Sequence, residues 1–189
     1  MPFSAACTQA CLQHVHTRYA GCMNLLSLNT VLRSQEMDFV RRCITADSFA
    51  IDIGANHGVY SLTMAKIASA GAVWAFEPAS LTADLLETSK NVNEFDNMTV
   101  CRQAVSDKPG VAEFVIEDAA SELNHLVFDG ATGDKPTEKV QVTTLDDCMQ
   151  QHAWRRMDFI KIDAEGAELQ ILEGAKLFFA ELSPLVMFE

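Results

Sequence analysis

A short apolar run that carries one acidic residue and is followed by two glycines constrains this fold more than any other feature. The run is Phe49–Ile53, and Gly54 and Gly58 separate it from the helical apolar spacing of Val59–Ser69. Gly54 allows a sharp turn in which a ligand can approach the backbone, and Gly58 allows the helix to pack closely on the strand. Backbone N–H groups at the start of such a helix can hold an anionic group. The segment therefore predicts a ligand-binding turn between a buried strand and a helix.

Strands and helices alternate along the rest of the chain. Apolar runs predict further strands at Ala72–Phe76, Met98–Arg102, Val111–Ile116, Val140–Thr143, Phe159–Ile162 and Leu185–Phe188. Helical periodicity predicts helices at Leu81–Phe95, Leu145–His152 and Ala167–Phe179. The polar stretch Glu117–Glu138 is expected to be a loop. This order predicts an α/β fold, a doubly wound parallel sheet whose ligand site lies at the carboxyl ends of the strands.

The first 45 residues differ from the remainder because they contain no strand pattern. We expect an N-terminal helical segment over residues 1–45, packed on a single domain over residues 46–189. No apolar run approaches the ~20 residues needed to span a membrane, and the N-terminus lacks the pattern of a signal peptide. The six cysteines form no C-x-x-C pair, which predicts reduced thiols, no metal site and a cytoplasmic location.

The charge balance bears on the kind of partner. The formal net charge is -12, with 14 Lys and Arg against 26 Asp and Glu, and no basic cluster interrupts it. An acidic surface repels phosphate backbones, so we expect no nucleic-acid partner and no membrane association. The simplest interpretation of the charge is solubility.

Two carboxylates at strand ends indicate the class of ligand. Asp52 places a negative charge at the turn, which disfavours a pyrophosphate and favours the cationic amino and sulfonium groups of S-adenosylmethionine. Asn56 occupies a position where a dinucleotide site has glycine, although a nicotinamide-dependent oxidoreductase stays open as an alternative. Glu77 follows the second strand, where a carboxylate can accept both ribose hydroxyls of an adenosine; the alternative is a solvated loop residue.

Five blocks of sequence, in order, resemble the FkbM-type methyltransferases. They are Asp52-Ile-Gly-Ala-Asn-His-Gly58, Ala75-Phe-Glu-Pro78, Ala104-Val-Ser-Asp107 with Gly110, Thr144-Leu-Asp146, and Ile160-Lys-Ile-Asp-Ala-Glu-Gly-Ala-Glu168 followed by Ile171-Leu-Glu-Gly-Ala175. The resemblance covers roughly residues 48–189. It implies a Rossmann-like class I methyltransferase fold, S-adenosylmethionine as donor, and O-methylation of a hydroxyl on a sugar or other small metabolite.

The resemblance also implies roles for particular residues. The resemblance implies cofactor binding by Asp52, Gly54, Asn56, Gly58, Glu77, Gln103, Ala104, Val105 and Asp163. We expect Ala55 within the turn and Tyr60 beside it to join them, with simple packing as the alternative for Tyr60. Of these, Glu77 would bind the ribose, the residues from 103 to 105 would close the third strand beside the adenine, and Asp163 would face the methyl group.

A hydroxyl acceptor has to lose a proton during transfer, so a general base is expected. Asp163 is the first candidate, because it closes the strand that should lie beside the methyl group. Glu165 is expected to hold the substrate or, with Asp163, a divalent cation. Lys161 should project to the same side of the sheet as Asp163 and keep that carboxylate ionised. The alternative is that Lys161, Asp163 and Glu165 form a purely structural ion-pair cluster. His57 and Glu168 are weaker candidates for the base.

The position at which the sequence ends determines how much of the family's fold we expect in it. The family continues past the fifth core strand with further sheet, whereas this sequence stops at Glu189. We therefore expect an apparently truncated fold with an exposed sheet edge, which a second copy of the chain would cover. A methyltransferase-like domain that binds without catalysing transfer is the non-enzymatic alternative.

Overall fold

Five parallel strands form the central sheet of the molecule. The computed structural model describes residues 35–116, 125–126 and 136–188. In spatial order the central strands are β3 (Met98–Cys101), β2 (Ala72–Phe76), β1 (Phe49–Ile53), β8 (Phe159–Ile162) and β9 (Leu185–Phe188). Every neighbouring pair is parallel, so all five strands end at the same edge, and the order reverses direction between β1 and β8. The predicted doubly wound α/β architecture is confirmed, and the switch point lies at β1 and β8.

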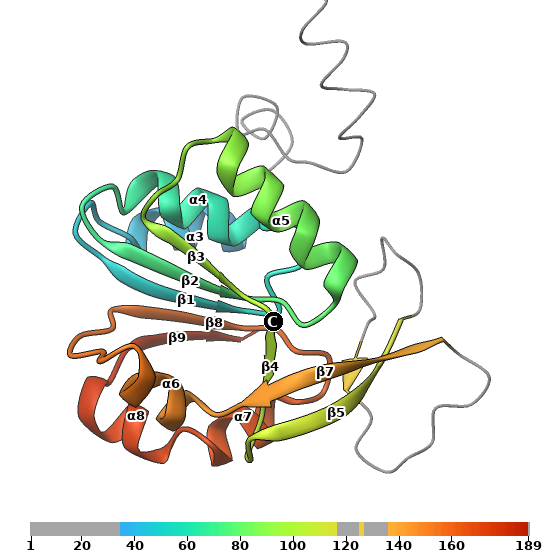
Figure 1. The fold of residues 1–189 in the computed structure, drawn as a ribbon. Coiled ribbons are helices and arrows are strands. Elements are labelled where there is room, and N and C mark those ends of the chain that lie inside the picture. Colours follow the sequence, from blue (N-terminus) through green and yellow to red (C-terminus); the bar gives the residue numbers. More distant parts are fainter. Residues whose placement is uncertain (1–34, 117–124, 127–135, 189) are drawn as a thin grey trace, which may run out of the picture.

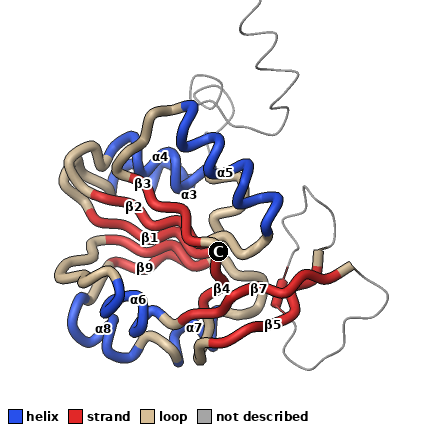
Figure 2. Tube along the Cα trace, viewed as in Figure 1, coloured by secondary structure: helices blue, strands red, loops and turns tan. Residues whose placement is uncertain are grey.

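Helices cover both faces of this sheet, as Figures 1 and 2 show. One layer consists of α3 (Gln35–Cys43), α4 (Val59–Ile67) and α5 (Ser80–Val92). The other consists of α6 (Leu145–Gln151), α7 (Glu168–Glu173) and α8 (Lys176–Leu182). Because parallel strands are buried on both faces, their side chains are mostly apolar on both, as in the run Phe49–Ile53, where Asp52 is the one exception.

A second, smaller sheet lies beside the carboxyl ends of the central strands (Figure 1). In spatial order its strands are β4 (Gln103–Val105), β7 (Thr137–Thr143), β5 (Gly110–Val115) and β6 (His125–Leu126). We call it the accessory sheet. β7 pairs parallel with β4 and antiparallel with β5, so the accessory sheet is one mixed unit inserted between β3 and α6.

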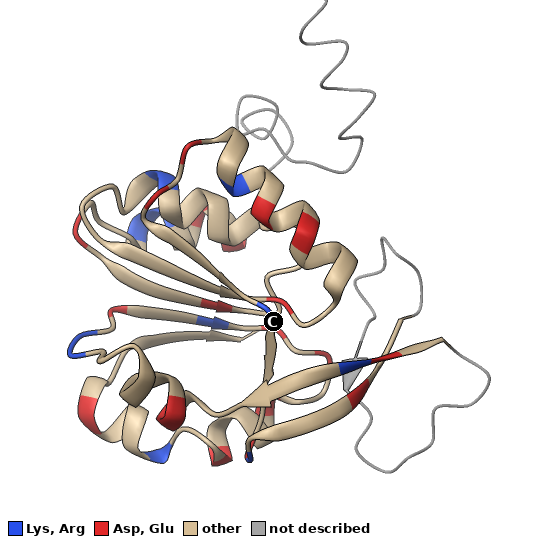
Figure 3. Cartoon of the chain, viewed as in Figure 1, with Lys and Arg blue, Asp and Glu red and all other residues tan. Residues whose placement is uncertain are grey.

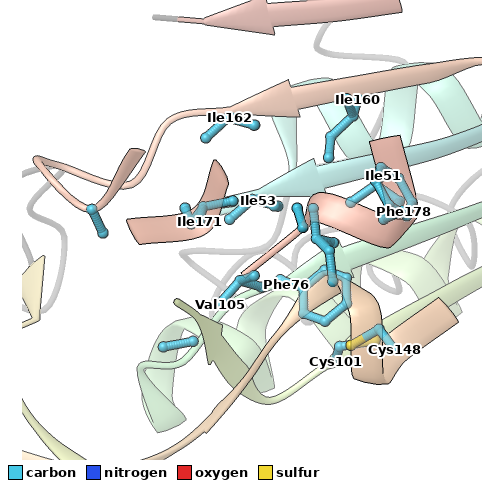
Figure 4. Packing of buried hydrophobic residues seen from close by; sticks show 14 of the residues in the cluster. Ile51, Ile53, Phe76, Cys101, Val105, Cys148, Ile160, Ile162, Ile171 and Phe178 are labelled. Atoms are coloured by element: carbon cyan, nitrogen blue, oxygen red, sulfur yellow. The ribbon is translucent and has the colours of Figure 1, made fainter. Parts of the chain in front are cut away.

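Apolar side chains fill the two spaces between sheet and helices. Figure 4 shows the larger cluster, in which Ile51, Phe76 and Ile160 from the central strands meet Ile171 and Phe178 from the α7 and α8 layer. A second cluster packs the opposite face against α3, α4 and α5. The large central side chains are 0–1 % exposed, a degree of burial that commonly contributes ~1.5–3 kcal/mol per side chain.

Three predicted boundaries were wrong. Gln103–Val105 does not close the third strand but begins the accessory sheet, because β3 ends at Cys101. The predicted loop Glu117–Glu138 contains β6 and the first residues of β7; its remaining residues lie outside those described. The single predicted helix Ala167–Phe179 is two helices, α7 and α8, separated at Gly174 and Ala175.

The break between α7 and α8 has a packing cause. Gly174 lies so close to the backbone of Ser106 that a β-carbon there would collide with the Ser106 carbonyl oxygen. Asp146 then caps the start of α8, since its carboxylate oxygens accept the N–H groups of Leu177 (3.2 Å) and Phe178 (2.8 Å). Thr144 caps α6 in the same way, with Oγ1 3.0 Å from the N atom of Asp147. The block Thr144-Leu-Asp146 therefore builds the fold rather than the ligand site.

Part of the predicted organisation falls outside the described residues. Of the N-terminal helical segment, only α3 and the two residues after it belong to the described chain, and α3 is helical as expected. The division into residues 1–45 and 46–189 stays a prediction. No helix in the described ranges is both long and apolar enough to cross a membrane.

Candidate functional site

A cavity of about 530 Å³ opens at the carboxyl edge of the central sheet. Its walls come from the segments that follow β1, β2 and β8 and from β4 and β5 of the accessory sheet. This volume lies within the ~300–1,000 Å³ range of small-molecule sites, and the position is the switch point of the sheet. The structure thus places a cavity where the sequence predicts the ligand.

The turn after β1 is held in an unusual backbone conformation. Gly54, Asn56 and Gly58 have φ angles of 74°, 49° and 86°, in the region that favours glycine. The N–H groups of Gly54 and Ala55 both donate to the carbonyl oxygen of Phe76, at 3.1 and 2.9 Å. These two donors are therefore engaged within the protein and tie the β1 turn to β2.

Glu77 connects this turn to the start of α5. Its Oε2 atom accepts the N–H of Asn56 and its Oε1 atom accepts the N–H of Ala79, both at 2.9 Å. Glu77 is buried and lines the cavity. Burial raises its pKa to about 7, against the effect of the two N–H donors, and the carboxylates of Asp52 and Glu138 add to the rise. Each carboxylate oxygen retains a second lone pair that can accept a ligand hydroxyl.

Asp52 lies beneath the turn and is not part of the cavity wall. One carboxylate oxygen accepts a hydrogen bond from the hydroxyl of Ser61 on α4. Burial raises the pKa of Asp52, while Lys161 and Ser61 oppose the rise. The expected contact between Asp52 and the cofactor stays a prediction; the observed role of Asp52 is to join β1, α4 and the lysine of β8.

Lys161 and Asp163 form an ion pair on the same side of β8, as the alternation of a strand predicts. The Lys161 Nζ atom lies 2.9 Å from Oδ2 of Asp163 and 4.6 Å from the centroid of the Tyr60 ring. Asp52 is the direct neighbour of Lys161 in the parallel pair β1–β8. The lysine side chain is 2 % exposed, whereas that of Asp163 is 30 % exposed. Asp163 is thus the more exposed member of the ion pair, and both members line the cavity.

The loop after β8 presents Glu165 at the cavity wall. Glu165 and Gly166 have φ angles of 48° and 95°, which is strained for a glutamate. Glu168 holds this conformation, because its Oε1 atom accepts the N–H groups of Ala164 (3.1 Å) and Gly166 (3.2 Å). The carboxylate of Glu168 therefore stabilises the conformation of this loop, and the side chain of Glu165 is exposed.

Most of the residues predicted for the site meet at the cavity, and some do not. Those that line it are Gly54, Ala55, Asn56, His57, Tyr60, Glu77, Gln103, Ala104, Val105, Lys161, Asp163, Glu165 and Glu168. Asp52 and Gly58 are not among the lining residues; Gly58 instead packs on Leu86 and Leu62. Sequence reasoning missed Phe114 of β5, because nothing in an ordinary alternating strand indicates that it turns towards a cavity.

No group of three or more His, Cys, Asp or Glu residues within the described part of the chain is arranged to hold a metal ion. The divalent-cation role considered for Asp163 and Glu165 receives no support from geometry, since Asp163 is paired with Lys161. The described cysteines, Cys43, Cys101 and Cys148, are free thiols.

A profile of the methyltransferase FkbM domain matches residues 52–189. The chain belongs to the FkbM methyltransferase family. The match begins at the β1 turn and runs to the last residue of the chain, so it includes the whole cavity and the accessory sheet. Membership of the family confirms the expected fold class and S-adenosylmethionine as the expected methyl donor.

Two curated relatives are fungal methyltransferases. Methyltransferase sdnD of Sordaria araneosa is 23 % identical over 159 residues, covering 69 % of this chain and 61 % of the relative. Methyltransferase 1 of Beauveria bassiana (strain ARSEF 2860) is 26 % identical over 148 residues, covering 68 % and 58 %. The chain therefore spans about three fifths of the length of these two relatives.

Solved structures also resemble the chain. An rRNA methylase from Streptococcus thermophilus aligns with a TM-score of 0.49 and 9 % identity, covering 84 % of this chain and 74 % of that one.

Proposed function

We propose that this member of the FkbM family is an S-adenosylmethionine-dependent O-methyltransferase acting on a hydroxyl of a sugar or other small metabolite. The observation that carries the proposal is the placement of Glu77 and Asp163 in one cavity, each just beyond the carboxyl end of its own strand, β2 and β8. The spacing of the β1 turn and the family match favour a methyl donor over the nicotinamide alternative.

The cavity suits S-adenosylmethionine in size and charge. Four carboxylates line it, from Glu77, Asp163, Glu165 and Glu168, against one lysine, Lys161. A negative lining favours a sulfonium and an ammonium group over a pyrophosphate. Glu77 would accept the ribose hydroxyls, and Gln103 and Ala104 of β4 would lie beside the adenine.

When bound, S-adenosylmethionine supplies an activated methyl group whose leaving group is neutral. The chain has to position the acceptor and take up its proton. Asp163 is the group best placed to take the proton, because its carboxylate reaches the cavity while Lys161 holds one of its oxygens. Glu165 would bind the acceptor at the exposed wall.

The donor is tested by titrating the purified chain with S-adenosylhomocysteine in a calorimeter, with NAD as the control. We expect one site for S-adenosylhomocysteine and no heat from NAD. Glu77→Ala should weaken binding by ~1–3 kcal/mol, the usual cost of losing a charged hydrogen-bond partner. Equal affinity for the variant would remove the ribose role of Glu77.

The base is tested by Asp163→Asn in assays of methyl transfer to a panel of sugars and small hydroxylated metabolites. We expect unchanged binding of S-adenosylhomocysteine and a rate lowered by a factor of ~100–10,000, the usual contribution of a general base. Transfer at the original rate would show that Asp163 is not the base. Binding without transfer to any acceptor in the panel would favour a binding domain over an enzyme.

The remaining expectations about partners and location stay proposals. Lys and Arg residues are spread over many of the described elements, without a basic element of the kind that tracks a phosphate backbone (Figure 3). This spread supports a small-molecule acceptor over a nucleic acid. We further propose a cytoplasmic protein that self-associates through the β9 edge of the sheet, where Leu185 and Phe188 are exposed.

A further inference from the structure

The accessory sheet reaches the cofactor site through two residues on one of its faces. Phe114 of β5 and Glu138 of β7 are direct partners in the antiparallel pair. Side chains of such partners lie on the same face of a sheet. Phe114 lines the cavity, so Glu138 projects from the face of the accessory sheet that is turned towards the site.

The start of α5 requires acceptors that its own sequence does not supply. The N-cap residue is Ala79, which has no side-chain acceptor, and no side-chain cap is present. Two carboxylates from outside the helix replace the cap. Oε1 of Glu77 accepts the N–H of Ala79 at 2.9 Å, and Oε1 of Glu138 accepts the N–H of Ser80 at 2.7 Å.

Glu77 and Glu138 thus hold consecutive N–H groups of one backbone segment. We propose that Glu138 is a positioning residue of the cofactor site, which fixes the first turn of α5 from the accessory sheet and thereby holds Glu77 in place for the ribose. This inference rests on the proposed role of Glu77 in cofactor binding.

The electrostatics provide a second connection between the two glutamates. The helix dipole favours both carboxylates at this end of α5, but their like charges repel each other. Burial is the main cause of the raised pKa of Glu77, and the charges of Asp52 on β1 and of Glu138 add to the rise. Removing the Glu138 charge should therefore make Glu77 ionise at lower pH, although Glu138 does not touch the ribose.

Three variants separate these effects in the full chain. Glu138→Gln keeps an oxygen that can accept the Ser80 N–H but removes the charge, and Glu138→Ala removes both. Glu113→Ala is the matched control. Glu113 is opposite Lys139 in the register of β5 and β7, one residue before Phe114, so its side chain lies on the other face of the accessory sheet. The measurement is the dissociation constant of S-adenosylhomocysteine from pH 5.5 to 9.

We expect the affinity of the unmodified chain to rise with pH around the pKa of Glu77, about 7. Glu138→Gln should keep the affinity at high pH and move the midpoint down by about half a pH unit, the order expected for one screened charge. Glu138→Ala should move it equally and also weaken binding about three- to tenfold at every pH, the scale of one charge-assisted hydrogen bond. Glu113→Ala should change neither quantity.

Three outcomes overturn the inference, and they are distinguishable. If both Glu138 variants behave like Glu113→Ala while Glu77→Gln weakens binding, Glu77 binds the cofactor but Glu138 does not position it. If Glu77→Gln leaves the affinity and its pH dependence unchanged, the ribose role of Glu77 fails and the role of Glu138 fails with it. A loss of affinity without a shifted midpoint in either Glu138 variant would show that Glu138 only stabilises the fold.

Discussion

The ammonium of Lys161 on β8 lies 2.9 Å from the carboxylate of Asp163, the residue that directly follows this strand. The lysine is enclosed by the protein, with the Tyr60 ring on one side and Asp52 on the neighbouring strand. Removing one member of such a buried charge cluster destabilises the folded protein, because each charge compensates for the lost hydration of the others.

Lys161→Met should destabilise the chain by about 3 kcal/mol, since it leaves the buried Asp52 and the half-buried Asp163 without their cation. Urea unfolding measures the loss. The control is Lys139→Met, at an exposed position of β7, which should change stability by no more than ~0.5 kcal/mol. Equal stability of the two variants would mean that Lys161 does not compensate these carboxylates.

Glu77 should make the stability of the ligand-free chain depend on pH. In the folded state its pKa is about 7, raised by burial, whereas the unfolded chain has the ordinary value of 4.5. Between these values the folded state holds a proton that the unfolded state has lost, so stability falls as pH rises from about 4.5 through 7. The contribution is about 3 kcal/mol.

Comparison with Glu77→Gln isolates this group, because glutamine does not titrate. The free energy of unfolding, measured in urea at pH 5 and at pH 8, should differ less between the two pH values in the variant than in the original chain. An identical pH dependence in both proteins would contradict a buried, protonated Glu77.

Gly54→Ala should cost about 3 kcal/mol and abolish cofactor binding. The residue has φ 74°, and an added methyl group would collide with the carbonyl oxygen of Asp163, so the β1 turn and the backbone at Asp163 would both have to move. Thermal unfolding and calorimetry with S-adenosylhomocysteine measure the two effects.

Two glycines serve as controls for this substitution. Gly166→Ala carries backbone strain at φ 95° but meets no atom within 4 Å, and Gly110→Ala has open space and no such φ. We expect a loss of ~1 kcal/mol for the first and little change for the second. A Gly54 variant no worse than Gly166→Ala would show that the turn tolerates displacement.

Asp146→Ala should lower stability by about 1–2 kcal/mol and leave cofactor affinity unchanged, because Asp146 caps α8 and is not among the residues that line the cavity. Chemical unfolding and calorimetry give the two readouts. Asp147→Ala, one residue further on and exposed, should be nearly neutral. A large loss of affinity in Asp146→Ala would instead place that residue in the functional site.

The local pattern of the sequence determined the central sheet and most of the cavity. Apolar runs of strand length predicted β1, β2, β8 and β9 within a residue, and a turn and a helical period follow the first three of them. Parallel strands end at one edge, so Glu77 and Asp163 were expected to meet, and alternation along β8 predicted that Lys161 would face Asp163.

Tertiary structure decided what depends on contacts between distant segments. Gln103–Val105 belongs to a second sheet because its partner, β7, lies more than thirty residues away in the chain. For the same reason no local signal indicates that Phe114 reaches the cavity or that Glu138 reaches the start of α5. Asp52, which by sequence is a ligand contact, lies buried against Ser61, since the depth of a side chain is set by the elements that pack over it.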